Sequence, residues 1–550
     1  MKKLCLLVFI IACFILAGCF SPYGGEMGTI TINLGGSAGR FSTGFNNAID
    51  TNVFDFSYDI KVIPVNGGTA ITIPAVPGSA IVSRSVPAGT YDIVVQTFAN
   101  GWDYANGSLP NFTVEAGKSN IAIVPMQRLS HAIVLSIPKD EFSKGHIFPP
   151  VLLSSPTPPE WPITVYNYTG GDVTLTIPPP TGFALTGTTS GTIPSDNSRT
   201  FTLSPTTTTT TGRRSAMLTI TAGGFSQIAP LSAIVADRVI THAGTGTDGL
   251  AGLSTSAAGQ YFVLANNIDL QNIAWTPIPT TGTFNGTLDG NGFTISGLFI
   301  NIAVNAADAD YNGLFAEIGA SGKVINLGVK GSVTARDYVG GIAGVVLGAV
   351  ENCYSDVAVT GRQYVGGIAG EIGSGSVSTG TMQNCYATGS VTGIYDTSFP
   401  GITSSRVGGI AGRVRSGNTA ANNVALNPSI SRNMGNQGTF GRVVGEAVTT
   451  APAAVLNNNH ANSGMQFIPG PTVQDLFTVK NHDGKDGADF TNSGRGAWGT
   501  AGPDWNIHNS KEEAQAAVAD MTTASPSFWN ASVSPWYWDA SAGRPRLWND

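Results

Sequence analysis

The sequence predicts an all-β protein, with two β-sandwich modules in its first half and a stack of repeated short strands in its second. Glycine contributes 70 of the 550 residues and charged residues only 11%, which suits strands joined by tight turns, because glycine adopts positive φ without steric cost. Alternating polar and apolar segments are separated by turn signals. One sequence pattern also returns at a fixed interval in the second half. A chain of this length forms several domains rather than one.

The N-terminus has the features of an export signal. Two lysines precede an apolar run at 4–17, which is shorter than the roughly 20 residues of a membrane-spanning helix. The run ends in the motif Leu-Ala-Gly-Cys at 16–19, which resembles the lipobox of bacterial lipoproteins. The resemblance implies cleavage between Gly18 and Cys19, and acylation of the Cys19 thiol, with palmitate among the acyl chains. Because Phe20 rather than Asp follows, it also implies anchoring at the outer membrane or cell surface. The alternatives are an ordinary signal peptide and a short membrane helix with an incidental cysteine.

We therefore expect a signal peptide at 1–18 and a lipidated tether at 19–27, followed by a first β-sandwich at 28–128. Its strands are predicted by alternating segments at 29–34 and 60–65, by a turn and strand at 87–95, and by two strands around a glycine turn at 114–124. The Pro-x-Gly-x-Tyr-x-Ile pattern that begins at Pro87 resembles the small Cna-B or transthyretin-like sandwiches of bacterial surface proteins.

A second β-sandwich is expected at 129–237, with a proline-rich linker at 154–159 near its start. Residues 161–236 resemble the Ig-like domains of the ASPM/SPD-2/hydin type in the order of their strands. We interpret both modules as a rigid stalk, because neither shows a cluster of ionisable or aromatic residues; ligand binding by exposed loops is the alternative. The strand segments of the second module are 163–175, 182–185, 199–205 and 216–221.

Residues 238–465 contain repeats. The motif Tyr-Val-Gly-Gly-Ile-Ala-Gly begins at Tyr338, recurs 26 residues later at Tyr364, and returns in shorter forms at Val407 and Gly441. Two further elements interleave with it, and they are always seven residues apart. The first element begins with Asn326, Asn352, Asn384 and Asn423, and the second begins with Val333, Val359, Val391 and Ile430.

Repeats of this length contain only short strands and no helix signal, so each must stack on its neighbours to bury its apolar face. Parallel stacking at about 4.8 Å aligns equivalent side chains. The recurrent asparagines are expected to stack their amides at a corner. Three inward ladders are expected: Val333, Val359, Val391 and Ile430; Ile342, Ile368 and Ile410; and Leu327, Cys353, Cys385 and Val424.

The Gly-Gly-Ile-Ala-Gly and Asn-Cys-Tyr elements, with segments 284–298 and 312–315 upstream, resemble GLUG-repeat proteins. The resemblance covers about 260–460. It implies a right-handed parallel β-helix, a fold often found in adhesin-like surface proteins. A β-propeller is the alternative, but its blades need about 40 residues or more.

The chain has five cysteines, of which Cys353 and Cys385 lie in the repeats at equivalent positions. We expect two buried thiols, because parallel Cβ vectors suit a disulfide poorly; a disulfide between adjacent repeats is the alternative. Beyond the repeats we expect a small C-terminal cap at 466–550, with a helix at 510–521. The tryptophan-rich end at 528–548 is interpreted as packing on the last repeat, and an aromatic sugar-binding platform is the alternative.

The sequence shows no motif for catalysis, metal or cofactor binding. The net charge of −7 offers no basic surface for nucleic acid. None of the six histidines begins a His-Glu-x-x-His motif, and there is no Gly-x-Ser-x-Gly or P-loop motif. A segment at 481–487 departs from the EF-hand calcium pattern. Glycosidases need two carboxylates within reach, yet the candidates fall in different phases of the repeat. These candidates are Asp337, Glu351, Asp356 and Glu371.

We therefore expect a non-enzymatic, monomeric surface lipoprotein that is attached to the membrane by its lipid and binds a host or environmental glycan or protein. Contact with the partner is expected at the insertions 372–381, 394–405 and 432–439, because loops on a rigid scaffold tolerate change. A carbohydrate-active enzyme on the same scaffold and a purely structural envelope protein are the alternatives.

Overall fold

The chain divides into two compact units. The first contains residues 1–146, 160–204 and 217–230, and the second contains 147–159, 205–216 and 231–550. The computed structural model describes residues 26–33, 54–73, 81–254, 258–306, 310–375, 379–394, 405–432, 438–462, 464–468, 485–486, 488–490, 536–539 and 544–547. Cys19 with its leader, and the helix expected at 510–521, lie outside these residues.

The described part is all-β, as predicted, and its helices are the 3₁₀ helix η1 (Leu250–Ser254) and the short α2 (Lys139–Lys144). Helix α2 follows Pro138, carries Asp140 in its first turn and buries Phe142. A helix of six residues is too short to show the periodicity by which helices are recognised in a sequence, so α2 was missed.

The strands up to residue 128 form two sheets, of orders β4-β1-β7 and β3-β2-β5-β6-β8. Alternate residues are buried along β2 and β5, so each presents one face to a core, as in a β-sandwich. The four segments predicted to contain strands all overlap observed strands. The strands are β1 (Met27–Asn33), β2 (Phe56–Pro64), β3 (Ile71–Ile73), β4 (Ile81–Pro87), β5 (Gly89–Ala99), β6 (Trp102–Val114), β7 (Ser119–Ile123) and β8 (Met126–Arg128).

The next part is also sandwich-like, with sheets of orders β14-β16-β12-β9 and β10-β18-β17-β13-β15, and β11 added to β18. Strand β9 precedes the proline-rich segment at 154–159, and its partner β12 follows that segment. The strands are β9 (Ile133–Leu135), β10 (His146–Ile147), β11 (Val151–Leu152), β12 (Trp161–Asn167), β13 (Val173–Thr176), β14 (Phe183–Gly187), β15 (Ser190–Ile193), β16 (Asn197–Pro205), β17 (Gly212–Ala222) and β18 (Phe225–Ala236).

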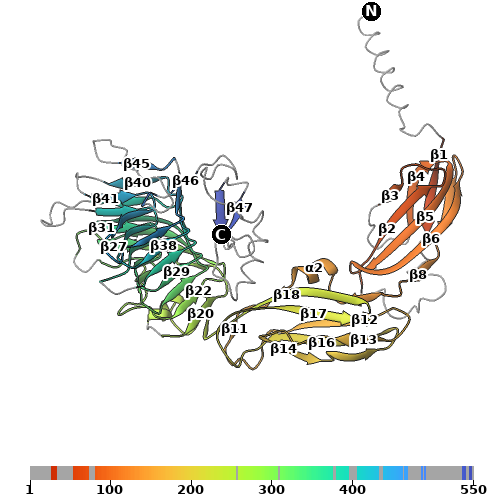
Figure 1. The fold of residues 1–550 in the computed structure, drawn as a ribbon, viewed down its shortest axis with the longest axis horizontal. Coiled ribbons are helices and arrows are strands. Elements are labelled where there is room, and N and C mark those ends of the chain that lie inside the picture. Colours follow the sequence, from red (N-terminus) through yellow and green to blue (C-terminus); the bar gives the residue numbers. More distant parts are fainter. Residues whose placement is uncertain are drawn as a thin grey trace, which may run out of the picture. The chain divides into compact units, whose positions relative to one another are not determined.

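The repeat region forms four parallel sheets, to which successive repeats add one strand after another (Figure 1). The first sheet contains β19 (Arg238–Ile240), β20 (Tyr261–Leu264), β22 (Thr287–Asp289), β25 (Lys323–Ile325), β29 (Ala349–Glu351), β33 (Thr381–Gln383), β38 (Thr419–Ala421) and β43 (Val455–Asn457). The second contains β21 (Ile268–Asp269), β23 (Thr294–Asn301), β26 (Gly328–Thr334), β30 (Tyr354–Gly361), β34 (Tyr386–Ala387), β35 (Val391–Gly393), β39 (Val424–Ala425), β40 (Ser429–Arg432), β44 (His460–Asn462), β45 (Gln466–Ile468) and β46 (Ala488–Phe490).

The other two sheets are shorter, and a separate antiparallel hairpin of β47 (Trp536–Asp539) and β48 (Arg544–Leu547) lies near the C-terminus of the sequence. The third sheet contains β24 (Phe315–Ile318), β28 (Ala343–Val346), β32 (Ala369–Ile372), β37 (Ala411–Val414) and β42 (Val444–Ala447). The fourth contains β27 (Asp337–Gly340), β31 (Gln363–Gly366), β36 (Ser405–Gly408) and β41 (Gly438–Gly441).

The first two predicted ladders are confirmed. Val333 pairs with Val359, Val359 with Val391, and Val391 with Ile430. The second ladder is joined by backbone hydrogen bonds from each isoleucine nitrogen to the carbonyl oxygen of the next isoleucine. All members are buried in a single apolar core that extends from Ile240 to Met465.

The third ladder was predicted in the wrong register at its fourth member. Because Gln383 pairs with Ala421 and Tyr386 with Val424, the residue opposite Cys385 is Asn423. The corner asparagine of this repeat is therefore Asn422, whose positive φ of 56° matches that of its equivalents. The repeat thus contains one residue more than the predicted seven-residue spacing, and a buried amide replaces the apolar member of the ladder.

The predicted amide ladder is present in the earlier repeats. Asn384 donates to Asn352 and Asn352 to Asn326, each over 3.2 Å from Nδ2 to Oδ1. Asn326 donates in turn to the buried carboxylate of Asp289, over 3.0 Å. Asp289 also accepts hydrogen bonds from the Tyr261 hydroxyl and from Arg213, so the row of amides ends on a charged group.

Candidate functional site

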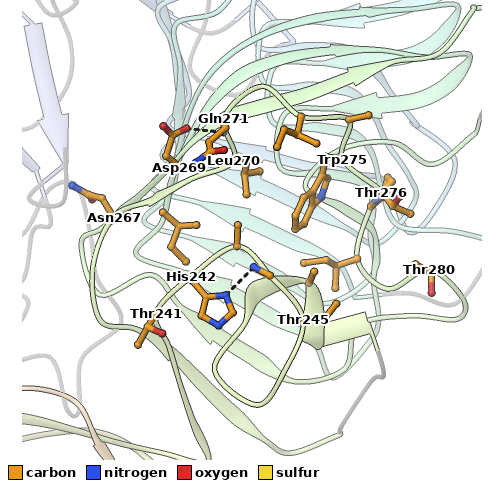
Figure 2. A pocket seen from close by; sticks show the side chains of 18 residues that line it. Thr241, His242, Thr245, Asn267, Asp269, Leu270, Gln271, Trp275, Thr276 and Thr280 are labelled. Atoms are coloured by element: carbon orange, nitrogen blue, oxygen red, sulfur yellow. Dashed lines mark hydrogen bonds between the residues drawn. The ribbon is translucent and has the colours of Figure 1, made fainter.

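A pocket of about 720 Å³ opens in the first repeats of the second unit (Figure 2). Two segments form it, one that runs from the end of β19 into η1 and one that surrounds and follows β21. Most of its polar groups are uncharged amides and hydroxyls. The lining side chains are those of Thr241, His242, Ala243, Thr245, Ala251, Asn267, Ile268, Asp269, Leu270, Gln271, Ile273, Ala274, Trp275, Thr276, Pro277, Ile278 and Thr280.

Trp275 supplies the aromatic surface of the pocket. Its backbone nitrogen donates to the carbonyl oxygen of Phe299 over 2.8 Å, and its indole Nε1 donates to that of Leu314 over 3.1 Å. The ring also packs against the apolar core. Because the only polar atom of the indole is already bonded, the ring offers the pocket a fixed apolar surface.

The ionisable groups of the segment that follows β19 are held by hydrogen bonds. His242 accepts at Nδ1 from the nitrogen of Gly244 over 2.9 Å, and its Nε2 lies 3.3 Å from the carboxylate of Asp248. Hydrogen bonds lower the pKa of Asp248; the largest effect comes from the Thr241 hydroxyl, the next from a backbone hydrogen bond and the third from His242. Among the described residues that line the pocket, Asp269 alone carries a carboxylate. The pocket is therefore equipped for binding through hydrogen bonds and an aromatic surface.

A second feature is an outward-facing row of side chains that we call the tyrosine ladder: Tyr311, Tyr338 and Tyr364. The rings of Tyr311 and Tyr338 stack with centroids 4.8 Å apart and planes inclined by 7°, and those of Tyr338 and Tyr364 with values of 4.6 Å and 22°. Strand pairing of Val365 with Val407 places Arg406 next in the row, where its guanidinium lies 5.0 Å from the centroid of Tyr364.

The end of the ladder is fixed by an ionic cluster. Glu371, of which 1% is exposed, binds both Arg413 and Arg415, and Arg406 binds Glu446. Arg413 also lies 4.0 Å from the ring centroid of Tyr364. Burial, with a smaller effect of the Glu371 charge, raises the pKa of Tyr338 to about 12.

Glycine is required where the third sheet passes the ladder. A β-carbon on Gly370 would lie 2.5 Å from the carbonyl carbon of Tyr338, and one on Gly344 would lie 2.6 Å from the Cα of Tyr311. Such distances are closer than carbon atoms can approach. The last glycine of the Gly-Gly-Ile-Ala-Gly motif is therefore explained by the close approach of the two backbones.

The carboxylates considered for catalysis do not form a pair in the described structure. Asp337 pairs with Arg362, and Glu371 lies in the ionic cluster beside the ladder. Asp356 accepts a hydrogen bond from Thr388, and Glu351 lies half-buried on β29. No group of three potential metal ligands occurs among the described residues.

Cys353 and Cys385 are free and buried, as expected. Burial raises the pKa of the Cys353 thiol well above its ordinary value. The centres of the three insertions proposed for partner contact, at 376–378, 395–404 and 433–437, lie outside the described residues.

Sequence reasoning missed both the pocket and the ladder. The pocket is built from 241–251 and 267–280, which precede the repeated motifs, so it left no periodic signal. The ladder did leave one, because Tyr338 and Tyr364 begin the two complete copies of the motif. The strand register then shows that both tyrosines point away from the core, as the valine after each is buried.

No protein-family model matches the chain. It is 34% identical over 111 residues to Halomucin of Haloquadratum walsbyi, a match that covers 18% of this chain and 1% of that protein. It is 35% identical over 105 residues to a putative Gly-rich membrane protein of Evansella cellulosilytica, covering 17% of this chain and 12% of the relative. The chain thus spans only a small part of these relatives.

Among solved structures, a protein of unknown function from Porphyromonas gingivalis is similar at 10% identity and a TM-score of 0.14, over 32% of this chain and 84% of that one. Domains 1–6 of the surface layer protein SbsC give 14% identity and a TM-score of 0.14, over 33% and 20%. Likenesses this weak carry no argument about function. Within the described residues, no helix has the length and apolar character needed to span a membrane.

Proposed function

We propose that the chain is a lipid-anchored cell-surface protein that binds glycans, without catalysis, through the pocket at Trp275. In this proposal the repeat region is a right-handed parallel β-helix of the GLUG-repeat type. The preceding modules, of Cna-B or transthyretin-like type and of Ig-like type, hold it away from the membrane.

The fold proposed for the repeat region is supported by parallel pairing in register along four sheets. It is also supported by a core that is shared by successive repeats. The stalk role of the modules is supported by their packing within the first unit, where Phe54 contacts Tyr166 with ring centroids 4.9 Å apart. Trp102 likewise donates to the carbonyl of Ile137 over 2.9 Å.

The surface location is supported by the leader and the lipobox-like motif, and by a relative whose name describes a membrane protein. Metabolic labelling with an alkyne-bearing palmitate tests the anchor directly. Wild type is expected to incorporate the label and Cys19→Ser to lose it, and equal labelling of both would contradict the anchor.

Glycan binding rests on one observation: a fixed indole surface in a pocket surrounded by amide and hydroxyl groups (Figure 2). The C–H face of a sugar packs on an aromatic ring, while its hydroxyls need hydrogen-bond partners beside that ring. The single carboxylate of the described lining favours binding over hydrolysis, which usually needs two.

A glycan array, with a polysaccharide-degradation panel beside it, tests the proposal on the full chain. Trp275→Ala should abolish binding. Because Trp275 also packs on the core, Thr276→Arg serves as a second variant, since it places a bulky side chain in the pocket from an exposed position. Thr209→Arg, at an exposed site away from the pocket, is the matched control and should bind like wild type.

Saturable binding of short oligosaccharides that Thr276→Arg abolishes and Thr209→Arg retains is the expected result. Release of reducing ends from a polysaccharide of the panel would show that the chain is an enzyme and would contradict binding without catalysis. Binding only to proteins, or none at all, would contradict the proposal.

A further inference from the structure

We propose that the tyrosine ladder is a second, elongated binding site, on which a linear polysaccharide lies along the axis of the repeats. This inference rests on the proposed function only for the class of ligand. Its residues are separate from those that line the pocket.

The backbone at the ladder indicates that the tyrosine side chains themselves are needed. Tyr311, Tyr338 and Tyr364 have φ values of 62°, 54° and 52°, a region that bulky residues rarely occupy. Asparagine adopts this region more readily, and this chain uses it at the equivalent angle at Asn326 and Asn352. A corner with no other role would be served by asparagine or glycine, so strain at three successive tyrosines points to a function of the rings.

The ladder is exposed and rigid before any ligand arrives. Tyr311 is 43% exposed, and Tyr338 and Tyr364 are partly exposed. Each ring is held by its neighbour, and Arg406 and Arg413 cover the last one. Side chains already fixed in place lose little conformational entropy on binding, and tyrosine combines an apolar ring with a hydroxyl.

The spacing of the ladder identifies the shape of the ligand. Successive rings lie 4.8 and 4.6 Å apart, which is the spacing of stacked strands. A pyranose unit in an extended glycan advances by a similar distance, so successive sugars can each meet one tyrosine. Because the ring faces are covered by neighbouring rings and by the arginines, the sugars would contact the exposed edges of the rings. A flat, open row suits the length of a polymer, whereas the pocket suits a short segment or an end.

The charges beside the ladder are largely paired. Asp310 binds Arg336 and Asp337 binds Arg362 along one side, while Glu371 and Glu446 bind the three arginines at the end. We therefore expect neutral polysaccharides to bind along the whole ladder. Acidic polysaccharides are expected to bind only at its Tyr364 end, where three guanidinium groups face two carboxylates.

Affinity electrophoresis of the full chain in gels that contain a neutral polysaccharide or an acidic one tests this site. The ladder variant is the double substitution Tyr311→Asn and Tyr338→Asn, because asparagine tolerates the local backbone. Ile121→Asn, which removes an exposed apolar side chain on β7 (64% exposed), is the control. Far-UV circular dichroism confirms that each variant is folded.

The double variant should bind neutral polymer about tenfold more weakly and bind short oligosaccharides as wild type does. Thr276→Arg should show the opposite pattern. Wild-type affinity of the double variant for polymer would overturn the ladder site alone, as would loss of both kinds of binding in a folded double variant. A preference for acidic polymer, or for a protein in place of glycan, would also overturn it. Absence of all glycan binding in wild type would overturn the proposed function as well.

Discussion

Replacing Asp289 with alanine removes the charged end of the amide ladder. The carboxylate is fully buried and accepts from the Tyr261 hydroxyl over 2.7 Å, from Arg213 over 3.1 Å and from Asn326 over 3.0 Å. It also accepts from the backbone nitrogen of Asn291 over 2.8 Å. Asp289→Ala leaves these donors in place without their acceptor, so the cost comes from stranded polar groups as well as from the lost bonds.

The expected magnitude follows from burial. Removing one partner of a buried ion pair costs about 3–5 kcal/mol, which corresponds to at least about a hundredfold more frequent local opening. Asp248→Ala is the control, because Asp248 pairs with His242 through a side chain that is 54% exposed, and exposed pairs contribute little.

Native-state hydrogen exchange measures this opening in the intact chain, without assuming two-state unfolding of several domains. Peptides that cover β22 and β25 should exchange at least about a hundredfold faster in Asp289→Ala and at the wild-type rate in Asp248→Ala. An acceleration below about tenfold, or an equal effect of both substitutions, would refute the role given to this carboxylate.

Three further predictions concern the repeats. Gly370→Ala should disrupt the ladder and destabilise the repeats by about 1–3 kcal/mol. Gly171→Ala is the control and should be neutral, because Gly171 has open space around it. Equal unfolding midpoints of the two variants would contradict the close approach of the Gly370 and Tyr338 backbones. Burial raises the pKa of Tyr338 from 10 to about 12 in the folded protein, so between pH 10 and 12 the folded state binds more protons than the unfolded state, and the free energy of unfolding should fall as the pH rises. Tyr338→Phe should weaken this pH dependence in urea titrations. An unchanged pH dependence in Tyr338→Phe would count against the raised pKa. Cys353 and Cys385 should resist alkylation in the native protein and react in urea, which peptide mass spectrometry detects; native labelling would show that they are accessible.

The sequence predicted most of the repeat architecture because each inward ladder comes from a local pattern that recurs at a nearly constant interval. The prediction failed at Asn423, because two asparagines are adjacent there and only the backbone shows that Asn422 turns the corner. The lengthened repeat still pairs Val391 with Ile430, so the extra residue is absorbed between the strands.

The candidate site was much less predictable. The pocket brings His242 and Trp275 together from segments with no shared motif, and its shape depends on tertiary packing. The tyrosines were visible in the sequence, but their outward direction and positive φ depend on the corner that the neighbouring strands impose. The recurrence of the tyrosine in the sequence therefore predicted its position in the repeat, but not that its side chain forms part of a binding surface.

Hydrogen exchange of the full chain, with and without an oligosaccharide identified on the array, tests glycan binding at the pocket most directly. Bound sugar is predicted to slow exchange in peptides covering 241–251 and 267–280, and to leave the rest of the described repeats unchanged. Protection confined to the sandwich modules, or no protection at saturating ligand, would contradict the assignment of the pocket as the binding site.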